Sequence, residues 1–392
     1  MFFAEHCLSL SLIVEYKSNG RYIAHEKENT VLSMDKLFSI IDSLSAGARL
    51  TEEQFEYLVS HRSDEGARLL QERAAAVRDE IYGRDIFVRG LVEFSNVCKN
   101  DCYYCGIRKS NPNLQRYRLS EAQIMYCVRS GYDLGFRTFV LQSGEDGHFT
   151  DDVLCDIIRQ IKTEYPDCAV TLSLGERSYE SYAALKEAGA DRYLLRHETA
   201  TKEHYEKLHP ADMSFENRMQ CLRDLRELGY AVGAGFMVGA PYQTPADLAR
   251  DFVFLQEFRP DMVGIGPFIP HHDTPFKDMP AGTLEDTLYY LSILRLMLPD
   301  VLLPATTALG TIHPLGREMG FDHGANVIMP NLSPATVRKQ YQLYDGKICV
   351  NDDATKCNAC IDLRLEKFGY RTVVDRGDKK EYVREKGGSL GE

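Results

Sequence analysis

Apolar residues recur three and four positions apart over residues 34–82, and the pattern then changes. The stretches LTEEQFEYLVS and GARLLQERAAAVRDEIYG both show this spacing, which predicts helices. From residue 84 onward, short β-rich runs alternate with helical stretches instead. We therefore expect N-terminal helices over residues 34–83 and a larger alternating domain over residues 84–330.

The alternating region contains eight β-rich runs. They are IFVRGLVEF, RTFVLQS, CAVTLSLG, DRYLLRH, AVGAGFMVG, DMVGIGPF, VLLPATT and ANVIMPN. Helical stretches are expected at 120–134, 151–164, 179–189, 214–228, 245–258, 284–298 and 313–320. Eight strands alternating with helices predict an α/β fold of the complete (βα)8 TIM-type barrel class. An open doubly wound sheet is the alternative, but no G-x-G-x-x-G follows the first run.

Three segments flank the predicted barrel. Residues 1–33 are expected to be a peripheral extension, because no basic residue precedes their apolar stretch and no small-residue cleavage site follows it. Residues 331–375 form a cysteine-containing C-terminal appendage. Residues 376–392 form a tail whose last part, REKGGSLGE, is expected to be disordered.

Residues that alternate along a strand share one face, so parity predicts which side chains enter the barrel lumen. Arg192, Arg196 and Glu198 share one face, opposite Tyr193 and Leu195. The predicted lumen holds Arg89, Glu93, Gln142, Thr171, Ser173, Arg192, Arg196 and Glu198, with Met262 beside two glycines. Ordinary barrel lumens are filled with branched apolar side chains. This set predicts either a chamber for a charged substrate or a self-satisfied network of salt bridges.

Composition narrows the function classes. The formal net charge is -12, and no basic stripe offsets it, which argues against nucleic-acid binding. No apolar run approaches the roughly 20 residues that a membrane span needs. Eleven cysteines in a large acidic chain without a recognisable signal predict a reducing compartment, the cytoplasm.

Three of the cysteines, Cys98, Cys102 and Cys105, lie within eight positions, with Tyr104 just before the last. Structural zinc takes four ligands, and a disulfide would leave one thiol over. An iron–sulfur cube with three cysteine ligands leaves one iron open to a substrate. This loop follows the first predicted strand, so it lies on the C-terminal face, where barrel active sites assemble.

The C-x3-C-x2-C spacing with its aromatic residue resembles the signature of radical S-adenosylmethionine (SAM) enzymes. Segments downstream, including AGADRYLLRHETA, MVGIGPFIPHHDTP and YQLYDGKIC, resemble the HydE family of [FeFe]-hydrogenase maturases. The similarity runs from about residue 84 to 365. Biotin synthase and methylornithine synthase share the barrel and the first cysteine motif, but not a second cysteine group near residue 350.

The resemblance implies a role for each motif. The three clustered cysteines would hold a [4Fe-4S] cluster with one open iron, and LQSGED at 141–146 resembles the glycine-rich loop that meets SAM. The residues implied in binding SAM are Glu198, Arg218, Tyr104, Gly144, Glu145 and Met262. The implied catalytic residues of the cavity are Arg196, Arg192, Gln142, Ser143, Thr171, Thr306, Thr307 and Tyr344. Cys349, Cys357 and Cys360 would hold an auxiliary [2Fe-2S] or [4Fe-4S] cluster, with surface zinc as the alternative.

The resemblance also implies a substrate and partners. The substrate is a small organometallic iron complex carrying cysteine, carbonyl and cyanide, and the product is a diiron precursor of the hydrogenase subcluster. The implied partners are a tyrosine-cleaving radical SAM maturase, a GTPase scaffold, and an electron donor such as ferredoxin or flavodoxin. Two alternatives are a radical SAM enzyme acting on another small or thiol-containing substrate, and a non-catalytic iron–sulfur carrier. His271 and His272 are expected to shape the top of the barrel, with metal ligation as the alternative.

Overall fold

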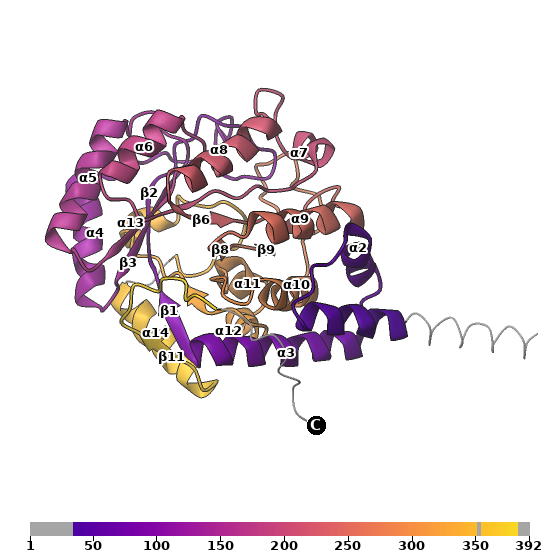
Figure 1. The fold of residues 1–392 in the computed structure, drawn as a ribbon. Coiled ribbons are helices and arrows are strands. Elements are labelled where there is room, and N and C mark those ends of the chain that lie inside the picture. Colours follow the sequence, from indigo (N-terminus) through magenta and orange to yellow (C-terminus); the bar gives the residue numbers. More distant parts are fainter. Residues whose placement is uncertain (1–33, 351–353, 383–392) are drawn as a thin grey trace, which may run out of the picture.

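The computed structural model describes residues 34–350 and 354–382. Residues 34–45 are helical and are followed by α2 (Glu52–Ser60) and α3 (Asp64–Tyr82). A capping box starts α2, because the Thr51 side chain accepts from the Gln54 backbone and the Gln54 side chain accepts from the Thr51 backbone. In Figure 1, α3 runs below the strands, and α2 stands at the right beside α9.

A six-stranded parallel sheet forms the centre of the fold. Its strands, in spatial order, are β2 (Gly90–Ser95), β3 (Thr138–Ser143), β4 (Ala169–Ser173), β5 (Arg192–Leu194), β6 (Ala231–Ala234) and β8 (Met262–Val263). Helices connect successive strands and lie outside them (Figure 1): α4 (Glu121–Asp133), α5 (Asp151–Glu164), α6 (Tyr179–Glu187), α7 (Lys202–Leu208), α8 (Phe215–Glu227) and α9 (Pro245–Phe258). The parallel order with outer helices fits a TIM-type barrel.

Between β8 and β2, the two outer strands of this sheet, the chain is connected by isolated bridges. Isolated parallel bridges join Met262 to Leu302, Pro304 to Val327 and Leu91 to Asn331. In addition, β10 (Val327–Ile328) pairs with β1 (Asp85–Val88), which pairs with β11 (Arg371–Val373).

Several predicted strands are divided in the structure. IFVRGLVEF splits at Arg89 into β1 and β2, which belong to different sheets. The runs at 231–239 and 261–268 also split, and their second halves, β7 (Met237–Val238) and β9 (Gly266–Pro267), form a separate pair. The backbone at Gly235, with φ +151, lies so close to Gly264 that a side chain would clash there. Two glycines therefore allow the strands to bend at this crossing.

The C-terminal third adds α10 (Leu284–Met297), α11 (Thr307–Ile312), α12 (Gly316–Asp322), α13 (Ala335–Arg338) and α14 (Ala354–Lys367). The predicted helix at 313–320 is wrong in its bounds. Pro314 lies between α11 and α12, and a proline cannot continue a helix because it lacks the backbone donor. No helix in the described ranges is both long and apolar enough to cross a bilayer.

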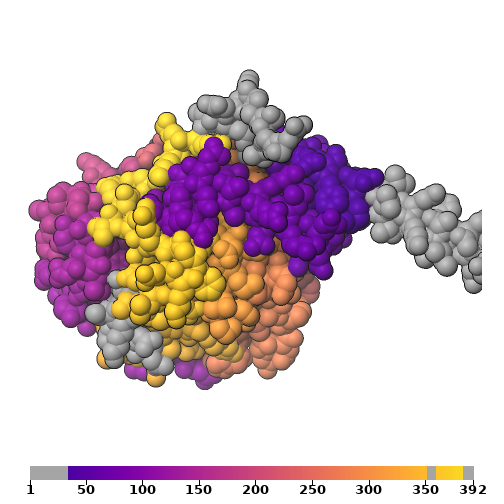
Figure 2. Space-filling model, turned by 90° about the horizontal axis from the view of Figure 1, so that it is seen from below, coloured from indigo at the N-terminus to yellow at the C-terminus, as the bar shows by residue number. Residues whose placement is uncertain are grey.

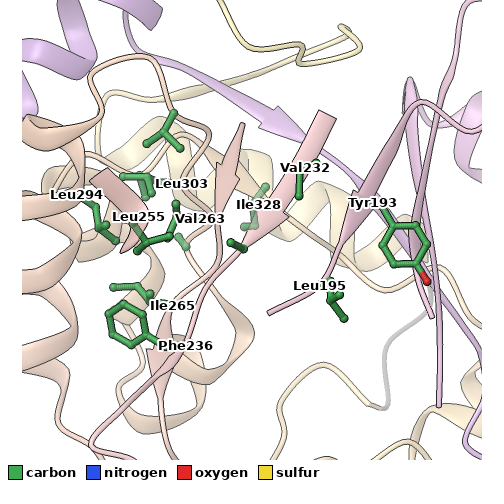
Figure 3. Close-up of a cluster of buried hydrophobic side chains, with 14 of the residues drawn as sticks. Tyr193, Leu195, Val232, Phe236, Leu255, Val263, Ile265, Leu294, Leu303 and Ile328 are labelled. Atoms are coloured by element: carbon green, nitrogen blue, oxygen red, sulfur yellow. The ribbon is translucent and has the colours of Figure 1, made fainter. Parts of the chain in front are cut away.

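The hydrophobic core lies between the strands and the outer helices. Val232 and Val263 on strands, and Leu255 and Leu294 on helices, belong to one buried cluster, part of which is shown in Figure 3. Strand residues of the opposite parity face the lumen. The outer layer thus takes up the apolar side chains and leaves polar ones inside the barrel.

The start of the C-terminal tail packs against the N-terminal ends of the strands. Arg192 donates to the Arg376 carbonyl at 2.9 Å and pairs with Asp378 at 2.5 Å, and the Thr138 hydroxyl donates to the same carbonyl at 2.6 Å. Figure 2 shows C-terminal residues in yellow beside α3 on this lower face. Residues 376–382 are therefore part of the packed structure, while REKGGSLGE lies outside the described residues.

Candidate active site

A cavity of about 420 Å³ occupies the lumen and its mouth. Most of the residues singled out in the sequence line it. They are Cys98, Cys102, Tyr104, Cys105, Gln142, Ser143, Gly144, Glu145, Arg196, Glu198, Arg218, Met262, Thr306, Thr307, Tyr344 and Cys349. A volume of this size is typical of a site for a small molecule.

The cysteine loop follows β2 and is held by side chains that bind its backbone. Arg116 donates to the carbonyl oxygens of Asn96 at 2.6 Å and Ile107 at 2.8 Å. The Gly106 backbone donates to the Leu343 carbonyl at 2.9 Å, and a side chain at Gly106 would clash with His271. The loop is therefore fixed between the barrel and the C-terminal region, and this brings its three thiols to one wall of the cavity.

At the three thiols, the effect of burial outweighs that of the nearby arginines, Arg116 and Arg218. Burial raises the pKa of Cys98 and Cys102, and it raises the pKa of Cys105 to about 12. Without metal the thiols are therefore protonated, and iron binding must displace their protons. Three thiols on one short loop facing a cavity match the ligand set of a cluster with one open iron.

Tyr104 is oriented by a neutral histidine. His209 Nδ1 lies 3.0 Å from the Tyr205 carbonyl, which can only accept, so Nδ1 carries the proton. Burial lowers the pKa of His209 to about 3, so Nε2 is left as an acceptor. The Tyr104 hydroxyl, 3.1 Å from Nε2, therefore donates to it. This bond fixes the aromatic ring next to Cys105.

The loop after β3 contacts the cysteine loop directly. The Gly144 backbone donates to the Ser95 carbonyl at 3.1 Å, and a Cβ at Gly144 would lie 2.7 Å from Cys98 Cβ. Glu145 accepts from the Glu176 backbone at 2.8 Å and pairs with Lys99 at 3.0 Å. Only glycine allows the two loops to approach this closely at position 144.

Two side chains of opposite charge, Glu198 and Arg196, line the cavity. Glu198 is buried, and its Oε2 has no hydrogen bond within the described part of the chain. Its backbone has φ +64, which is costly for a residue other than glycine and is often found at functional sites. No hydrogen bond or ion pair of the Arg196 guanidinium is found among the described residues, although Arg196 Nε would lie 3.9 Å from a Cβ at Gly264. A charged ligand can satisfy both groups.

Arg192 and Thr171 lie elsewhere, which corrects the expectation that they line the cavity. Arg192 is the first residue of β5, and its guanidinium is ion-paired with Asp378 below the cavity. Thr171 is buried in β4, in register with Arg192. Parity gives the correct side of the strand, but it carries no information on depth along the barrel axis.

The second cysteine group is described in part. Cys349 lines the cavity, and Arg317 Nη2 lies 3.2 Å from its sulfur. Cys360 is exposed on α14, and the side chain of Cys357 lies outside the described part of the structure. The auxiliary cluster stays a prediction.

His272 pairs with Asp345 at 2.7 Å, in a loop at the rim.

Sequence reasoning missed several cavity residues. Lys347 lines the cavity and pairs with Glu93 at 2.5 Å, while Asn331 donates to the same carboxylate at 2.6 Å. Lys347 lies in an irregular segment without periodicity. No local sequence signal could have placed it in the lumen.

Comparisons with known proteins match this geometry. The radical SAM superfamily model matches residues 92–255. The [FeFe] hydrogenase maturase subunit HydE of Thermotoga maritima is 50% identical over 307 residues, covering 78% of this chain and 87% of that protein. The chain belongs to the HydE family. It is accordingly a radical SAM enzyme, and the family implies a [4Fe-4S] cluster and SAM as its cofactors.

More distant relatives share the fold with this HydE-family chain. A 3-methylornithine synthase from Methanosarcina barkeri is 28% identical over 345 residues, covering 87% of this chain and 95% of the relative. The structure of methylornithine synthase PylB matches with a TM-score of 0.74 and 27% identity, covering 85% of this chain and 97% of PylB. The structure of HydG from Carboxydothermus hydrogenoformans matches with a TM-score of 0.73 at 20% identity, over 93% of this chain and 85% of HydG, and supports the fold alone.

Proposed function

We propose that this protein is the HydE-type radical SAM enzyme of [FeFe]-hydrogenase maturation, with an iron–cysteine–carbonyl–cyanide complex as its substrate. The observation that carries the proposal is that the three clustered thiols, Glu198 and Arg196 line one cavity. The 50% identity to a HydE subunit supports the choice of substrate class.

The residues present fit the cofactors. Cys98, Cys102 and Cys105 would hold the [4Fe-4S] cluster, and Glu198 and Arg218 would bind SAM. When bound and reduced by an electron donor, the cluster would supply the one electron that cleaves the sulfonium of SAM into methionine and a 5′-deoxyadenosyl radical. The unpartnered Glu198 Oε2 can accept from a hydroxyl or amino group of SAM, and its buried position makes that bond strong.

The upper lumen suits a small anionic iron complex. Arg196 lines this space, and no described carboxylate forms an ion pair with its guanidinium, so the cation is available to an anionic ligand. Thr306 Oγ1 is buried without a hydrogen-bond partner in the described part of the chain, and Thr307 lies next to it. Gln142 and Tyr344 add further polar groups around the same space, and Ser143, whose hydroxyl donates to the Gly144 carbonyl at 2.7 Å, adds an acceptor. These groups would orient the bound cysteine so that the radical attacks its sulfur, and the enclosed lumen excludes water from that step.

As the bond between the 5′ carbon and the sulfur forms, the iron–sulfur bond would break and the iron would keep the odd electron. Two such reduced iron species would pair to give a diiron precursor of the hydrogenase subcluster. The proposed partners are the tyrosine-cleaving maturase that supplies the complex, the GTPase scaffold that receives the product, and ferredoxin or flavodoxin as the electron donor. Cys349, Cys357 and Cys360 would hold the auxiliary [2Fe-2S] or [4Fe-4S] cluster, to which we assign no catalytic role. We also propose that the three isolated bridges complete an eight-stranded barrel.

The test uses anaerobically reconstituted protein with SAM, a low-potential reductant and the synthetic iron complex. We expect SAM to be cleaved to methionine and the complex to be consumed. Arg196→Ala should abolish consumption of the complex while SAM still binds, and Arg223→Ala, which removes an exposed arginine bonded to Gln220, should behave as wild type. Normal turnover by Arg196→Ala, or a wild-type protein that cleaves SAM but leaves the complex intact, would contradict the proposal.

A further inference from the structure

One wall of the cavity is an irregular segment, residues 338–349, which we call the strap. Its residues Tyr341, Tyr344 and Lys347 line the cavity. Residues 339–349 contain neither helix nor strand, so no regular backbone ladder holds them. The position of the strap therefore depends on individual side-chain and backbone contacts.

Lys347 makes the contact that reaches into the lumen. Its Nζ pairs with Glu93 Oε1 at 2.5 Å and donates to the Tyr341 carbonyl at 2.9 Å. The other oxygen, Glu93 Oε2, accepts from Asn331 at 2.6 Å. The side chains of Lys347 and Glu93 are only 8% and 2% exposed, so this pair is screened little by water.

This contact also closes a loop in the strap. Because Lys347 Nζ binds the Tyr341 carbonyl, it ties together the two ends of the segment 341–347, and Tyr344 lies at its middle. The Tyr341 hydroxyl in turn accepts from Gln142 at 3.3 Å, across the cavity wall. One ammonium group thus fixes both tyrosines relative to β2, the strand that precedes the cysteine loop.

Other contacts hold the strap at the rim. Leu343 accepts from the Gly106 backbone at 2.9 Å, and Asp345 pairs with His272 at 2.7 Å. These contacts fix the outer edge of the strap to neighbouring loops. On the inner edge, the Tyr344 hydroxyl is hydrogen-bonded to the Thr311 side chain and the Tyr341 hydroxyl accepts from Gln142. The Lys347–Glu93 pair is the charged contact that ties this edge to the lumen.

We propose that Lys347 is a positioning residue whose ion pair with Glu93 holds Tyr341 and Tyr344 as the wall against which the substrate is bound. The proposal rests on the proposed function for the identity of that substrate. Without the pair, the wall loosens and the complex is held less firmly. The 5′-deoxyadenosyl radical then takes a hydrogen atom from a buffer or protein C–H bond, so SAM is spent without product.

Three variants and one control test this role. Lys347→Met keeps the length of the side chain but removes the charge, and Lys347→Arg keeps the charge. Lys347→Met combined with Glu93→Gln removes both charges, so no lone buried carboxylate is left to unfold the protein. Lys162→Met is the matched control. Lys162, in α5, also bonds to a carboxylate and to a carbonyl: its Nζ lies 3.2 Å from Asp191 and donates to the Cys168 carbonyl at 2.8 Å.

Two measurements read the strap itself and the chemistry. Hydrogen exchange of residues 338–349 should be about tenfold faster in Lys347→Met and in the double variant, and Lys347→Arg should restore protection. KM for the iron complex and the ratio of 5′-deoxyadenosine to product should each rise about tenfold in the same two variants, because a slightly misplaced substrate is sufficient for a loss of that size. The Kd for SAM and the iron content should stay within about twofold of wild type.

The outcomes separate the two proposals. The role of Lys347 would be overturned if Lys347→Met and Lys162→Met had the same hydrogen exchange, the same KM and the same ratio of 5′-deoxyadenosine to product. In that case normal turnover by the wild type would still support the proposed function. A wild type that does not consume the complex would overturn the proposed function, and the exchange data would still decide whether Lys347 holds the strap. If Lys347→Met lowered SAM binding and iron content and also made hydrogen exchange faster across the whole barrel, Lys347 would have a purely structural role. That result would overturn the inference.

Discussion

Arg218 Nε donates to Glu176 Oε1 at 2.6 Å, and Arg218 Nη1 donates to the Arg196 carbonyl at 2.7 Å. These two bonds hold the guanidinium plane at the cavity wall, and neither uses Nη2. The Arg196 carbonyl lies two residues before Glu198, so one arginine fixes the backbone that carries both charged groups of the cavity. The arrangement explains how a strand end without regular pairing keeps a defined geometry.

Arg218→Lys should weaken SAM binding. A lysine cannot make two bonds in a fixed fork, so both the backbone anchor and the proposed contact to SAM would be impaired. Loss of one charge-assisted hydrogen bond costs about 1.5–3 kcal/mol, which corresponds to a rise in Kd of roughly 10- to 150-fold. Equilibrium dialysis of radiolabelled SAM with the anaerobic protein measures this, with Arg223→Lys as the surface control. An unchanged Kd would exclude Arg218 from the SAM site.

Glu198→Gly separates binding from folding. Glycine adopts φ +64 without strain, and relief of that strain, about 1 kcal/mol or more, offsets the lost side-chain packing. We expect the free energy of unfolding to stay within about 1 kcal/mol of wild type while the Kd for SAM rises at least tenfold. Chemical denaturation and dialysis provide the two measurements. A variant that binds SAM normally would show that Glu198 has no cofactor role.

Gly144→Ala should prevent cluster assembly. A Cβ at this position would press on Cys98 Cβ and on the Val97 carbonyl, so the cysteine loop would have to shift. Gly147→Ala is the matched control in the same loop, because a Cβ there meets no atom within 4 Å. Iron analysis and the visible absorbance of reconstituted protein should show less than about half of the wild-type cluster for Gly144→Ala only. Equal iron in both variants would argue against the close approach of the two loops.

His323 gives the fold a defined pH dependence. Burial lowers the pKa of His323 from 6.5 to about 4, and its Nδ1 lies 2.9 Å from the Ser292 hydroxyl. Its contribution to stability is complete above the unfolded pKa near 6.5 and is lost as the pH falls toward 4. Between about pH 7.5 and about pH 5.5 this amounts to about 1.4 kcal/mol.

His323→Asn should lack that contribution, because asparagine does not titrate in this range. The fall in Tm between the two pH values should be smaller than in wild type by about 2 °C for a chain of this length. Differential scanning calorimetry of both proteins under the same anaerobic conditions measures the difference. Identical pH dependence in the two proteins would show that the pKa of His323 is the same in the folded and the unfolded protein.

The sequence was informative where the determinant is local. Cys98, Cys102 and Cys105 lie on one loop, and the parity of Arg196 and Glu198 follows from the alternation of a strand. The depth of a side chain along the barrel axis depends on distant parts of the chain. Parity therefore predicts Arg192 in the cavity, whereas in the structure Asp378, nearly 190 residues away in the sequence, pairs with it below the cavity.

The other features that the sequence did not predict depend on contacts between segments that are distant in the sequence. Lys347 enters the lumen only because an irregular segment crosses the mouth of the barrel and meets Glu93. The division of two predicted strands depends on the approach of Gly235 to Gly264, which belong to different β-rich runs. Periodicity within one run cannot predict a contact between two.

The auxiliary cysteines need to be removed before the primary cluster can be observed alone. In the variant Cys349→Ser/Cys357→Ser/Cys360→Ser, only the loop containing Cys98, Cys102 and Cys105 remains as a cysteine cluster site. The electron paramagnetic resonance spectrum of this variant, reduced without oxygen and recorded with and without SAM, tests the open iron directly. We predict a [4Fe-4S] spectrum that changes when SAM is added and changes little in Glu198→Gly at the same SAM concentration. A spectrum that is identical with and without SAM would contradict an open iron at this cavity.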